Sequence, residues 1–490
     1  MEKRIEKIKK EEKGITLVAL VVTIIVLLIL AGVAISFTLG EDGIFKKAKD
    51  AADRMQNAAS NEKIQIGELT NEITKVMEKD EIGTDIYVTL YNDGTLTFGT
   101  QNEPIEGKTV IKEYGNIKGE EYTSWNEGDE HFNDTPWFNE KETITKVSII
   151  DEIVPTSMAN WFESCSNLTE IIGLEKINTE YVENMAGMFG RCNSLISVNV
   201  SKFDTSNVED MNNMFLGCSS LKSVDVSSFN TINVKSMINM FGECTNLIEI
   251  KGLENFNTNK VTNMSAMFTK CKSLTSINIS NFDTSSVENM HAMFYECNKL
   301  IKILGLENFN TENVINMISL FSGCNSLSNI DLSSFDTSNV TNMHDMFLDC
   351  TNLIEIKGLE NFNTSKVTDM GAMFGRCNSL TSVNVNGFDT GKVETMSNMF
   401  LDCSSLTNLN VNNFNTVNVK NTVSMFYGCT NLKDIDLSSF NTINMVNMDR
   451  MFVNCTNLTV IYVGENWDLS NVESTLDMFM GCGTDKTTLK

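Results

Sequence analysis

The stretch VENMAGMFGRCNSLISVNVSKFDTSN, from Val182 to Asn207, decides the fold because close copies of it follow one another from residue 151 to residue 490. All 13 cysteines belong to these copies, at intervals of 26 or 27 residues, and a Phe stands three residues before each of them. Such a period is typical of a solenoid, in which each unit buries its apolar side chains against its neighbours.

One segment of the unit has the periodicity of a helix. Met185, Met188, Phe189 and Cys192 stand at positions i, i+3, i+4 and i+7, which would place the four side chains on one face of a short helix. Their apolar character favours core packing over an adaptable Met-rich binding groove. We therefore predict one short helix in each unit.

The following segment alternates like a strand. Val198 and Val200 are separated by a polar residue, and the turn after them contains Thr205, which we expect to cap the next helix at its N-terminus. All three Pro residues precede residue 156, as expected if interior strands need every backbone N–H. Each unit is thus predicted to add one short parallel strand.

The stretch SSFDTSNVTNMHDMFLDCTNL, from Ser333 to Leu353, closely resembles the BspA-like leucine-rich-repeat proteins of bacterial surfaces. The pattern L-x-x-[VI]-[DN]-[VIL] within the period is that of a leucine-rich repeat. The resemblance covers about 340 residues, 151–490, and implies an α/β solenoid made of helix-and-strand units. It also implies an exported adhesion or interaction module of a Gram-positive-like bacterium, with no catalytic activity.

The N-terminal residues predict attachment to a membrane. Residues 1–14 form a basic leader, and residues 15–38 are predicted to form a transmembrane helix, since Ile15 to Ile35 carry no charge. A helix of that length spans about 31 Å, close to the thickness of a bilayer's hydrocarbon core. Because the basic flank should stay in the cytoplasm, we expect a single-pass protein of the cell membrane whose C-terminal part is extracellular.

The same segment resembles the N-terminus of type IV prepilins, in which a basic leader ends in Gly before a hydrophobic helix. That resemblance implies cleavage between Gly14 and Ile15 by a prepilin peptidase. Ala19 stands where pilins generally carry Glu, which weakens the expectation of assembly into a filament. An uncleaved signal anchor is the alternative.

Two further regions precede the repeats. Residues 39–80 are predicted to form an amphipathic helical stalk, because small and apolar residues recur at three- and four-residue spacing. Residues 81–150 are predicted to form a small β-rich region that caps the solenoid. There, apolar and polar residues alternate on both sides of Asn92-Asp93-Gly94, the pattern of a hairpin.

Composition and residue chemistry exclude several functions. The net charge is -26, and no long basic patch follows residue 14, so nucleic acid is not an expected partner. The uniform spacing and odd number of cysteines favour buried thiols over disulfides. His291 and His344 occupy one position two units apart, about 10 Å, too far to share a metal. We expect no catalytic, cofactor or metal site.

The strand side of the solenoid is the candidate binding surface. A polar residue recurs beside the inward apolar pair of most units, and we expect it to contact a protein or glycan on a host cell, the matrix or another cell. A role in solubility alone is the alternative. The candidate residues are Asn199, Asp225, Asn278, Asp331, Asn384, Asn410 and Asp436.

Overall fold

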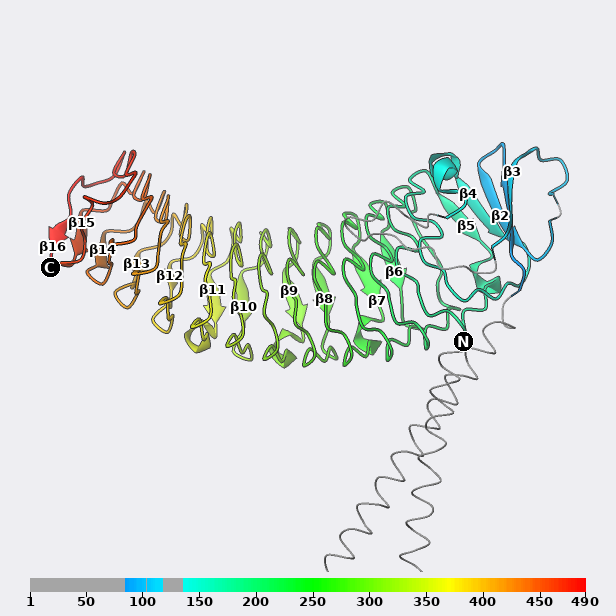
Figure 1. The fold of residues 1–490 in the computed structure, drawn as a ribbon, viewed down its shortest axis with the longest axis horizontal. Coiled ribbons are helices and arrows are strands. Elements are labelled where there is room, and N and C mark those ends of the chain that lie inside the picture. The colour runs from blue at the N-terminus through cyan, green and yellow to red at the C-terminus, as the bar shows by residue number, and fades with distance from the viewer. Residues whose placement is uncertain (1–83, 103, 118–134) are drawn as a thin grey trace, which may run out of the picture. The chain divides into compact units, whose positions relative to one another are not determined.

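The structure is a computed structural model that describes residues 84–102, 104–117 and 135–490 (Figure 1). The chain divides into two compact parts, Met1–Asp80 and Glu81–Lys490, and every described residue belongs to the second. The predicted leader with Gly14 and Ile15, the 15–38 helix and the 39–80 stalk lie outside the described residues. Within those residues, no helix has the length and apolar composition needed to cross a bilayer.

A five-stranded sheet begins the second part. The predicted hairpin is confirmed: β1 (Tyr87–Tyr91) and β2 (Thr95–Gly99) are antiparallel and flank the turn. The sheet order is β3-β1-β2-β4-β5, with β3 (Val110–Asn116), β4 (Lys146–Ile149) and β5 (Glu170–Ile172). A short 3-10 helix, η1 (Phe138–Thr143), precedes β4. Because β5 belongs to the first repeating unit, this sheet joins the N-terminal region directly to the solenoid.

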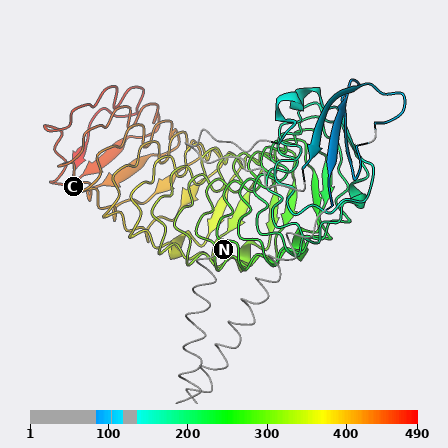
Figure 2. The same cartoon turned by 45° about the vertical axis from the view of Figure 1, so that its right-hand side comes forward.

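The repeating units stack as predicted, each adding a parallel strand or bridge. Short strands follow one another along one side (Figure 2). They are β6 (Ser223–Asp225), β7 (Glu249–Lys251), β8 (Ser276–Asn278), β9 (Lys302–Leu304), β10 (Asn329–Asp331), β11 (Glu355–Lys357), β12 (Ser382–Val383), β13 (Asn408–Leu409), β14 (Asp434–Leu437), β15 (Val460–Val463) and β16 (Thr488–Leu489). A second line of parallel bridges runs from Asn184–Asp210 to Asn447–Ser474. The predicted solenoid is therefore confirmed.

Some units carry a 3-10 helix directly after the strand. These are η2 (Leu174–Lys176), η3 (Leu253–Asn255), η4 (Leu306–Asn308) and η5 (Leu359–Asn361), and they follow β5, β7, β9 and β11. A Gly in the left-handed conformation precedes each of them. The unit that contains such a Gly and 3-10 helix is called a long unit below, and the others are called short units.

The predicted α-helix in each unit is wrong for the described residues. The N–H groups of Met185, Gly187 and Phe189 donate to carbonyl groups of the next unit, at 3.0, 2.8 and 2.9 Å. Met188 N–H, which lies between them, and Cys192 N–H each donate to the carbonyl three residues earlier, and Gly187 and Arg191 have φ values of 64° and 58°. Because alternate N–H groups donate to carbonyl groups of the neighbouring unit, consecutive β-turns form in place of the helix. The Met, Phe and Cys side chains are nevertheless buried, as predicted.

The core consists of columns of identical side chains. Phe rings stack from unit to unit, with centroids 5.5 Å apart for Phe189 and Phe215. Every cysteine from Cys192 to Cys455 donates its thiol to the carbonyl of a Phe in the preceding unit, at 3.0 to 3.2 Å. The predicted buried thiol is confirmed at these positions, and it also links neighbouring units.

The predicted helix-capping role of Thr is also wrong. The Thr205 hydroxyl donates to the carbonyl of Asn230 in the next unit at 3.0 Å and accepts the N–H of the same residue at 2.8 Å. Thr179 bonds Asp204 in the same manner. These threonines are fully buried, so each hydroxyl satisfies two backbone groups that water does not reach.

Candidate functional site: the strand face

The seven predicted contact residues lie on one surface, as the sequence indicates. We call this surface the strand face; it comprises the exposed side chains on and beside the strands from residue 196 to residue 436. Six of the seven are exposed and Asp436 is half-buried. Asn199 lies in a unit without an assigned strand, whereas Asp225, Asn278 and Asp331 end β6, β8 and β10.

All seven side chains have a structural role that the sequence analysis missed. Each side-chain oxygen accepts the backbone N–H of the residue two positions later, at 3.0 to 3.3 Å, as in an Asx turn. The oxygen that accepts this bond is present in both Asp and Asn, which explains why these two residue types alternate there. The sequence carried a signal for this role, since Asp and Asn side chains commonly bond the backbone two residues later in a turn.

Ion pairs and hydrogen bonds within the turns stabilise the ionised form of the carboxylates on this surface. Lys357 Nζ lies 2.5 Å from Asp331 Oδ2 and, together with Ser333, lowers the pKa of Asp331 to about 2. The Ser227 hydroxyl and N–H lower the pKa of Asp225. Both aspartates are therefore ionised at neutral pH and oriented before any partner arrives.

Long and short units alternate in the centre of the strand face. The strands pair as β6–β7, β8–β9 and β10–β11, and each pair forms a separate parallel sheet. In each pair the second strand belongs to a long unit, whose Gly approaches the preceding turn closely. A Cβ on Gly305 (φ 97°) would lie 2.3 Å from Ser280 Cα, so only Gly fits there. The parallel strands of these central units are thus divided into pairs.

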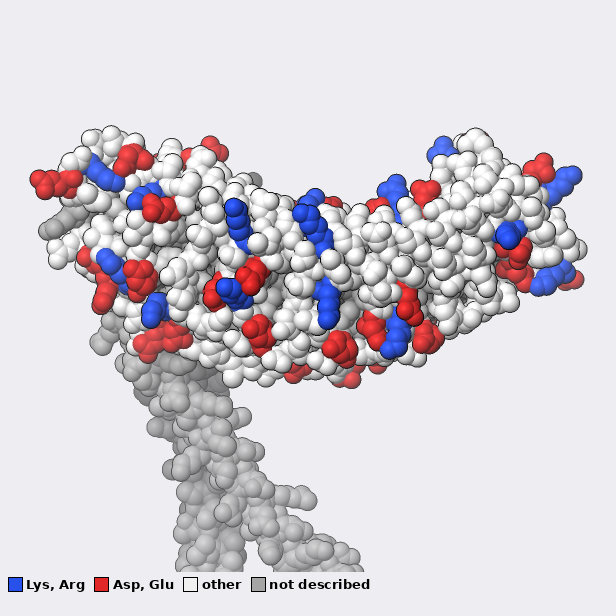
Figure 3. Space-filling model, turned by 180° about the vertical axis from the view of Figure 1, so that it is seen from behind, with Lys and Arg blue, Asp and Glu red and all other residues white. Residues whose placement is uncertain are grey.

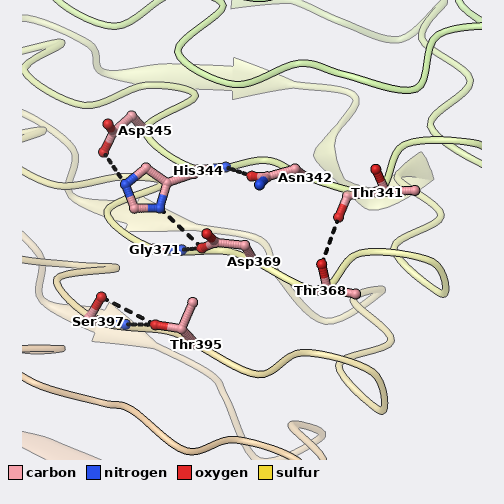
Figure 4. Close-up of polar contacts among 9 residues, drawn as sticks. All are labelled: Thr341, Asn342, His344, Asp345, Thr368, Asp369, Gly371, Thr395 and Ser397. Atoms are coloured by element: carbon pink, nitrogen blue, oxygen red, sulfur yellow. Dashed lines mark hydrogen bonds and ion pairs between the residues drawn. The ribbon is translucent and has the colours of Figure 1, made fainter.

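One cluster of titratable side chains joins His344 to two carboxylates (Figure 4). His344 Nδ1 lies 3.1 Å from Asp369 Oδ1, and Nε2 lies 3.3 Å from Asp345 Oδ1. Gly371 makes room for the ring, because a Cβ there would lie 2.5 Å from Nδ1. The hydrogen bond to Asp369 raises the pKa of His344, and burial raises the pKa of Asp345.

This histidine geometry does not match a hydrolytic triad. Both ring nitrogens face carboxylates, whereas a general base needs one nitrogen directed at the nucleophile's hydroxyl. In residues 84–102, 104–117 and 135–490, no three His, Cys, Asp or Glu side chains converge as a metal site requires. Burial raises the pKa of Cys218 to about 12, which makes that thiol a poor nucleophile at neutral pH.

The repeats match the sequence pattern of a known family, described as "Mycoplasma protein of unknown function, DUF285". The matches overlap and cover residues 156–277, 224–303, 245–354, 298–383 and 376–490. The chain belongs to this family. The DUF285 pattern thus covers most of the sequence and all the units that form the strand face. No curated protein matches the sequence.

Several solved structures of bacterial leucine-rich repeat proteins are similar to this member of the DUF285 family. One from Bacteroides ovatus has 17% identity and a TM-score of 0.41, over 84% of this chain and 99% of that one. A leucine rich cell surface protein from Faecalibacterium prausnitzii has 17% identity and a TM-score of 0.36, over 80% and 98%. One from Eubacterium ventriosum has 18% identity and a TM-score of 0.38, over 82% and 94%.

Proposed function

We propose that this protein is a membrane-anchored, extracellular interaction protein of a bacterial surface, and that its strand face binds a protein or glycan on a host cell, the matrix or another cell. One observation carries the proposal. Polar side chains recur on an exposed face over many units, and Asx turns hold each of them in a fixed orientation. A surface ordered in advance loses less conformational entropy when it binds a partner.

Acidic and basic side chains are mixed, so recognition should depend on individual contacts more than on attraction by a uniform charge. Figure 3 shows Lys and Arg interspersed with Asp and Glu on one face of the molecule. On the strand face, Lys357 pairs with Asp331 of the neighbouring unit at 2.5 Å, and Lys251 lies 3.9 Å from Glu249 of its own unit. Affinity should therefore come from many modest contacts spread over several units.

The test uses two triple variants of Asp225, Asp331 and Asp436. Replacing all three by Asn removes the charge and keeps the oxygen that accepts the turn N–H, whereas replacing them by Lys removes both. We expect the Asn variant to unfold at the wild-type midpoint but to adhere less to cells, mucins or matrix proteins. The Lys variant should lose adhesion and also unfold earlier. Wild-type adhesion by a folded Asn variant would exclude the acidic residues as contacts.

The N-terminal sequence favours a second candidate, a minor pilin or pseudopilin of a type IV filament or secretion system. Its support is Lys13-Gly14-Ile15-Thr16-Leu17, which matches the prepilin pattern, while Ala19 departs from it. N-terminal sequencing of protein from membranes separates the possibilities. A mature chain that starts at Ile15 supports processing by a prepilin peptidase, and an intact Met1 supports a signal anchor. Recovery in sheared filaments would favour the pilin.

A further inference from the structure

Four exposed isoleucines recur at every second unit of the strand face. Ile196, Ile248, Ile301 and Ile354 are 55, 59, 59 and 55% exposed, and the intervals between them are two units long. The units between them carry Lys222, Thr275 and Ser328 at the same position. An aliphatic side chain exposed to this degree contributes little to the core. Its recurrence at a fixed spacing therefore indicates a contact surface.

A cleft lies beside one of these isoleucines, where two strand pairs meet. Strands β9 and β10 belong to different sheets, and the space next to them forms a cleft of about 110 Å³. Its walls include Ile301, Ile303, Leu306 and Ile330. An apolar cavity of about 150 Å³ holds a benzene molecule, so this cleft has the size for one aliphatic side chain.

The same apolar positions recur at the neighbouring junctions. Ile248, Ile250, Leu253 and Ile277 occupy them between β7 and β8. Ile354, Ile356, Leu359 and Val383 occupy them between β11 and β12. The three junctions therefore present one equivalent apolar position every two units.

A carboxylate accompanies each of these junctions. Glu307 lines the cleft, and Glu254 and Glu360 occupy the equivalent positions. All three are exposed, and none makes an ion pair within the described part of the chain. Glu307 uses one oxygen to accept the Gly305 N–H at 3.2 Å. A partner that places a cation at each of these positions would complement the carboxylates of a protein of net charge -26.

The spacing selects the conformation of the partner. Parallel strands are about 4.8 Å apart, so two units span about 9.6 Å along the solenoid axis. A polyproline II helix brings every third side chain back to one face after about 9.3 Å, whereas a β-strand does so after about 6.8 Å. An α-helix needs seven residues and about 10.5 Å, and over the two intervals between the three junctions it accumulates about 2 Å of mismatch, against about 0.6 Å for polyproline II.

We infer that the strand face binds an extended, basic protein segment in the polyproline II conformation, lying along the solenoid axis. One aliphatic side chain of the segment enters each junction, and a Lys or Arg lies beside each of Glu254, Glu307 and Glu360. This inference deepens the proposed function, on which it rests, by naming the class of partner. Lys302, which has no ion-pair partner within the described residues, is the one cation that opposes the segment at the central cleft.

The experiment measures binding of a fluorescent peptide with four Leu-Pro-Lys repeats to the full-length protein by anisotropy. We expect the triple variant Ile248→Thr, Ile301→Thr, Ile354→Thr to bind at least tenfold more weakly, and it should fold because Thr is the natural residue at positions 275 and 381. Changing Glu254, Glu307 and Glu360 to Gln should weaken binding severalfold. Lys302→Glu, which copies positions 249 and 355, should tighten it severalfold.

Matched controls decide the outcome. Ile315→Thr alters an isoleucine that is 47% exposed and lies outside the strand face, and it should leave binding unchanged. A peptide of the same composition with its leucines grouped together should bind at least tenfold more weakly than the repeat. Equal binding of the two peptides, tighter binding of a helical peptide with leucines seven residues apart, or tighter binding of Leu-Pro-Asp repeats would each overturn the inference.

The proposed function can fail separately. Adhesion of the protein to cells or matrix without binding of the repeat peptide would refute this inference and leave the proposed function standing. Peptide binding without adhesion to any cell, mucin or matrix protein would refute the adhesive role in the proposed function, while the peptide site on the strand face would stand.

Discussion

The central units, from β6 to β11, and the later units, from β12 to β14, share one core but differ on the strand face. Phe rings stack without interruption through both regions, as in Phe321–Phe347 at 5.7 Å and Phe400–Phe426 at 5.8 Å. On the surface, the central units alternate between long and short, whereas the later ones are all short and carry Thr381, Thr407 and Lys433 where the long central units carry Ile. The core columns thus specify stacking, and they leave the strand face free to vary.

The largest effect should come from the shared core. We expect Phe321→Ala and Phe400→Ala each to cost about 3 to 5 kcal/mol, because each removes a ring that is packed on both sides. Urea unfolding of the purified protein measures both. A loss in only one of the two regions would show that the core is not equivalent along the solenoid.

Glycine-to-alanine substitutions should affect the two regions differently. Gly305→Ala in a central long unit should cost about 2 to 4 kcal/mol, from the left-handed backbone and the approach to Ser280. Gly391→Ala in a later unit should change stability by less than about 0.5 kcal/mol, because a Cβ there meets only side-chain atoms at 3.2 Å or more. Thermal unfolding of the two variants compares them. Similar losses would contradict the special role of Gly in long units.

The cysteine column should respond alike in both regions. Cys324→Val should destabilise the protein by about 1 to 2 kcal/mol more than Cys324→Ser, since Ser can still donate to the Phe294 carbonyl and Val cannot. Cys403, which bonds Phe374, serves as the counterpart in the later units. A less stable Ser variant would show that apolar volume outweighs the hydrogen bond.

Thiol chemistry gives a second measurement of the same column. Native alkylation followed by mass spectrometry should modify Cys482, which is only half-buried, and leave the cysteines from Cys165 to Cys455 unmodified until the protein is denatured. Intramolecular disulfides in the native sample would overturn the assignment of these residues to a packed core.

The smallest expected effect is the pH dependence of His344. Its pKa is raised by the hydrogen bond to Asp369, so the pair stabilises the folded state below the unfolded value of about 6.5, and this contribution is lost as pH rises through the folded pKa. Because the ring is more than one third exposed, the effect should stay well below 1 kcal/mol. The unfolding midpoints at pH 6 and pH 8 should differ less in the His344→Asn variant than in the wild type. Asn is the residue found at the equivalent position 212. If the variant shows the same difference between pH 6 and pH 8 as the wild type, His344 is not the cause of the pH dependence.

Sequence periodicity predicted which side chains are buried but not how the backbone is bonded. An α-helix and a series of β-turns both bury positions i, i+3, i+4 and i+7, so the Met185–Cys192 pattern could not distinguish them. The difference depends on where the N–H groups donate, and their acceptors lie in the next unit. Frequent Asn, Asp and Gly at positions such as Asn213 and Gly217 were the available signal, because these residues adopt positive φ readily.

The candidate surface was predicted in position and only partly in chemistry. Exposure of the Asp225 and Asp331 column followed from alternation with buried apolar residues, which a single unit already shows. The pairing of strands could not be predicted in that way, since it depends on whether two neighbouring units are long or short. The position of the exposed isoleucines at the junctions between strand pairs therefore could not be predicted either.

The close approach of Gly305 to the turn of the preceding unit has a consequence for how such genes change length. Gly252, Gly305 and Gly358 recur at intervals of 53 residues, so a long unit always meets a short neighbour that accommodates it. A duplication or deletion of 53 codons would preserve that complementarity, whereas one of 26 or 27 codons in the central region can set two long units side by side. Unequal recombination should therefore lengthen or shorten the central region in steps of two units.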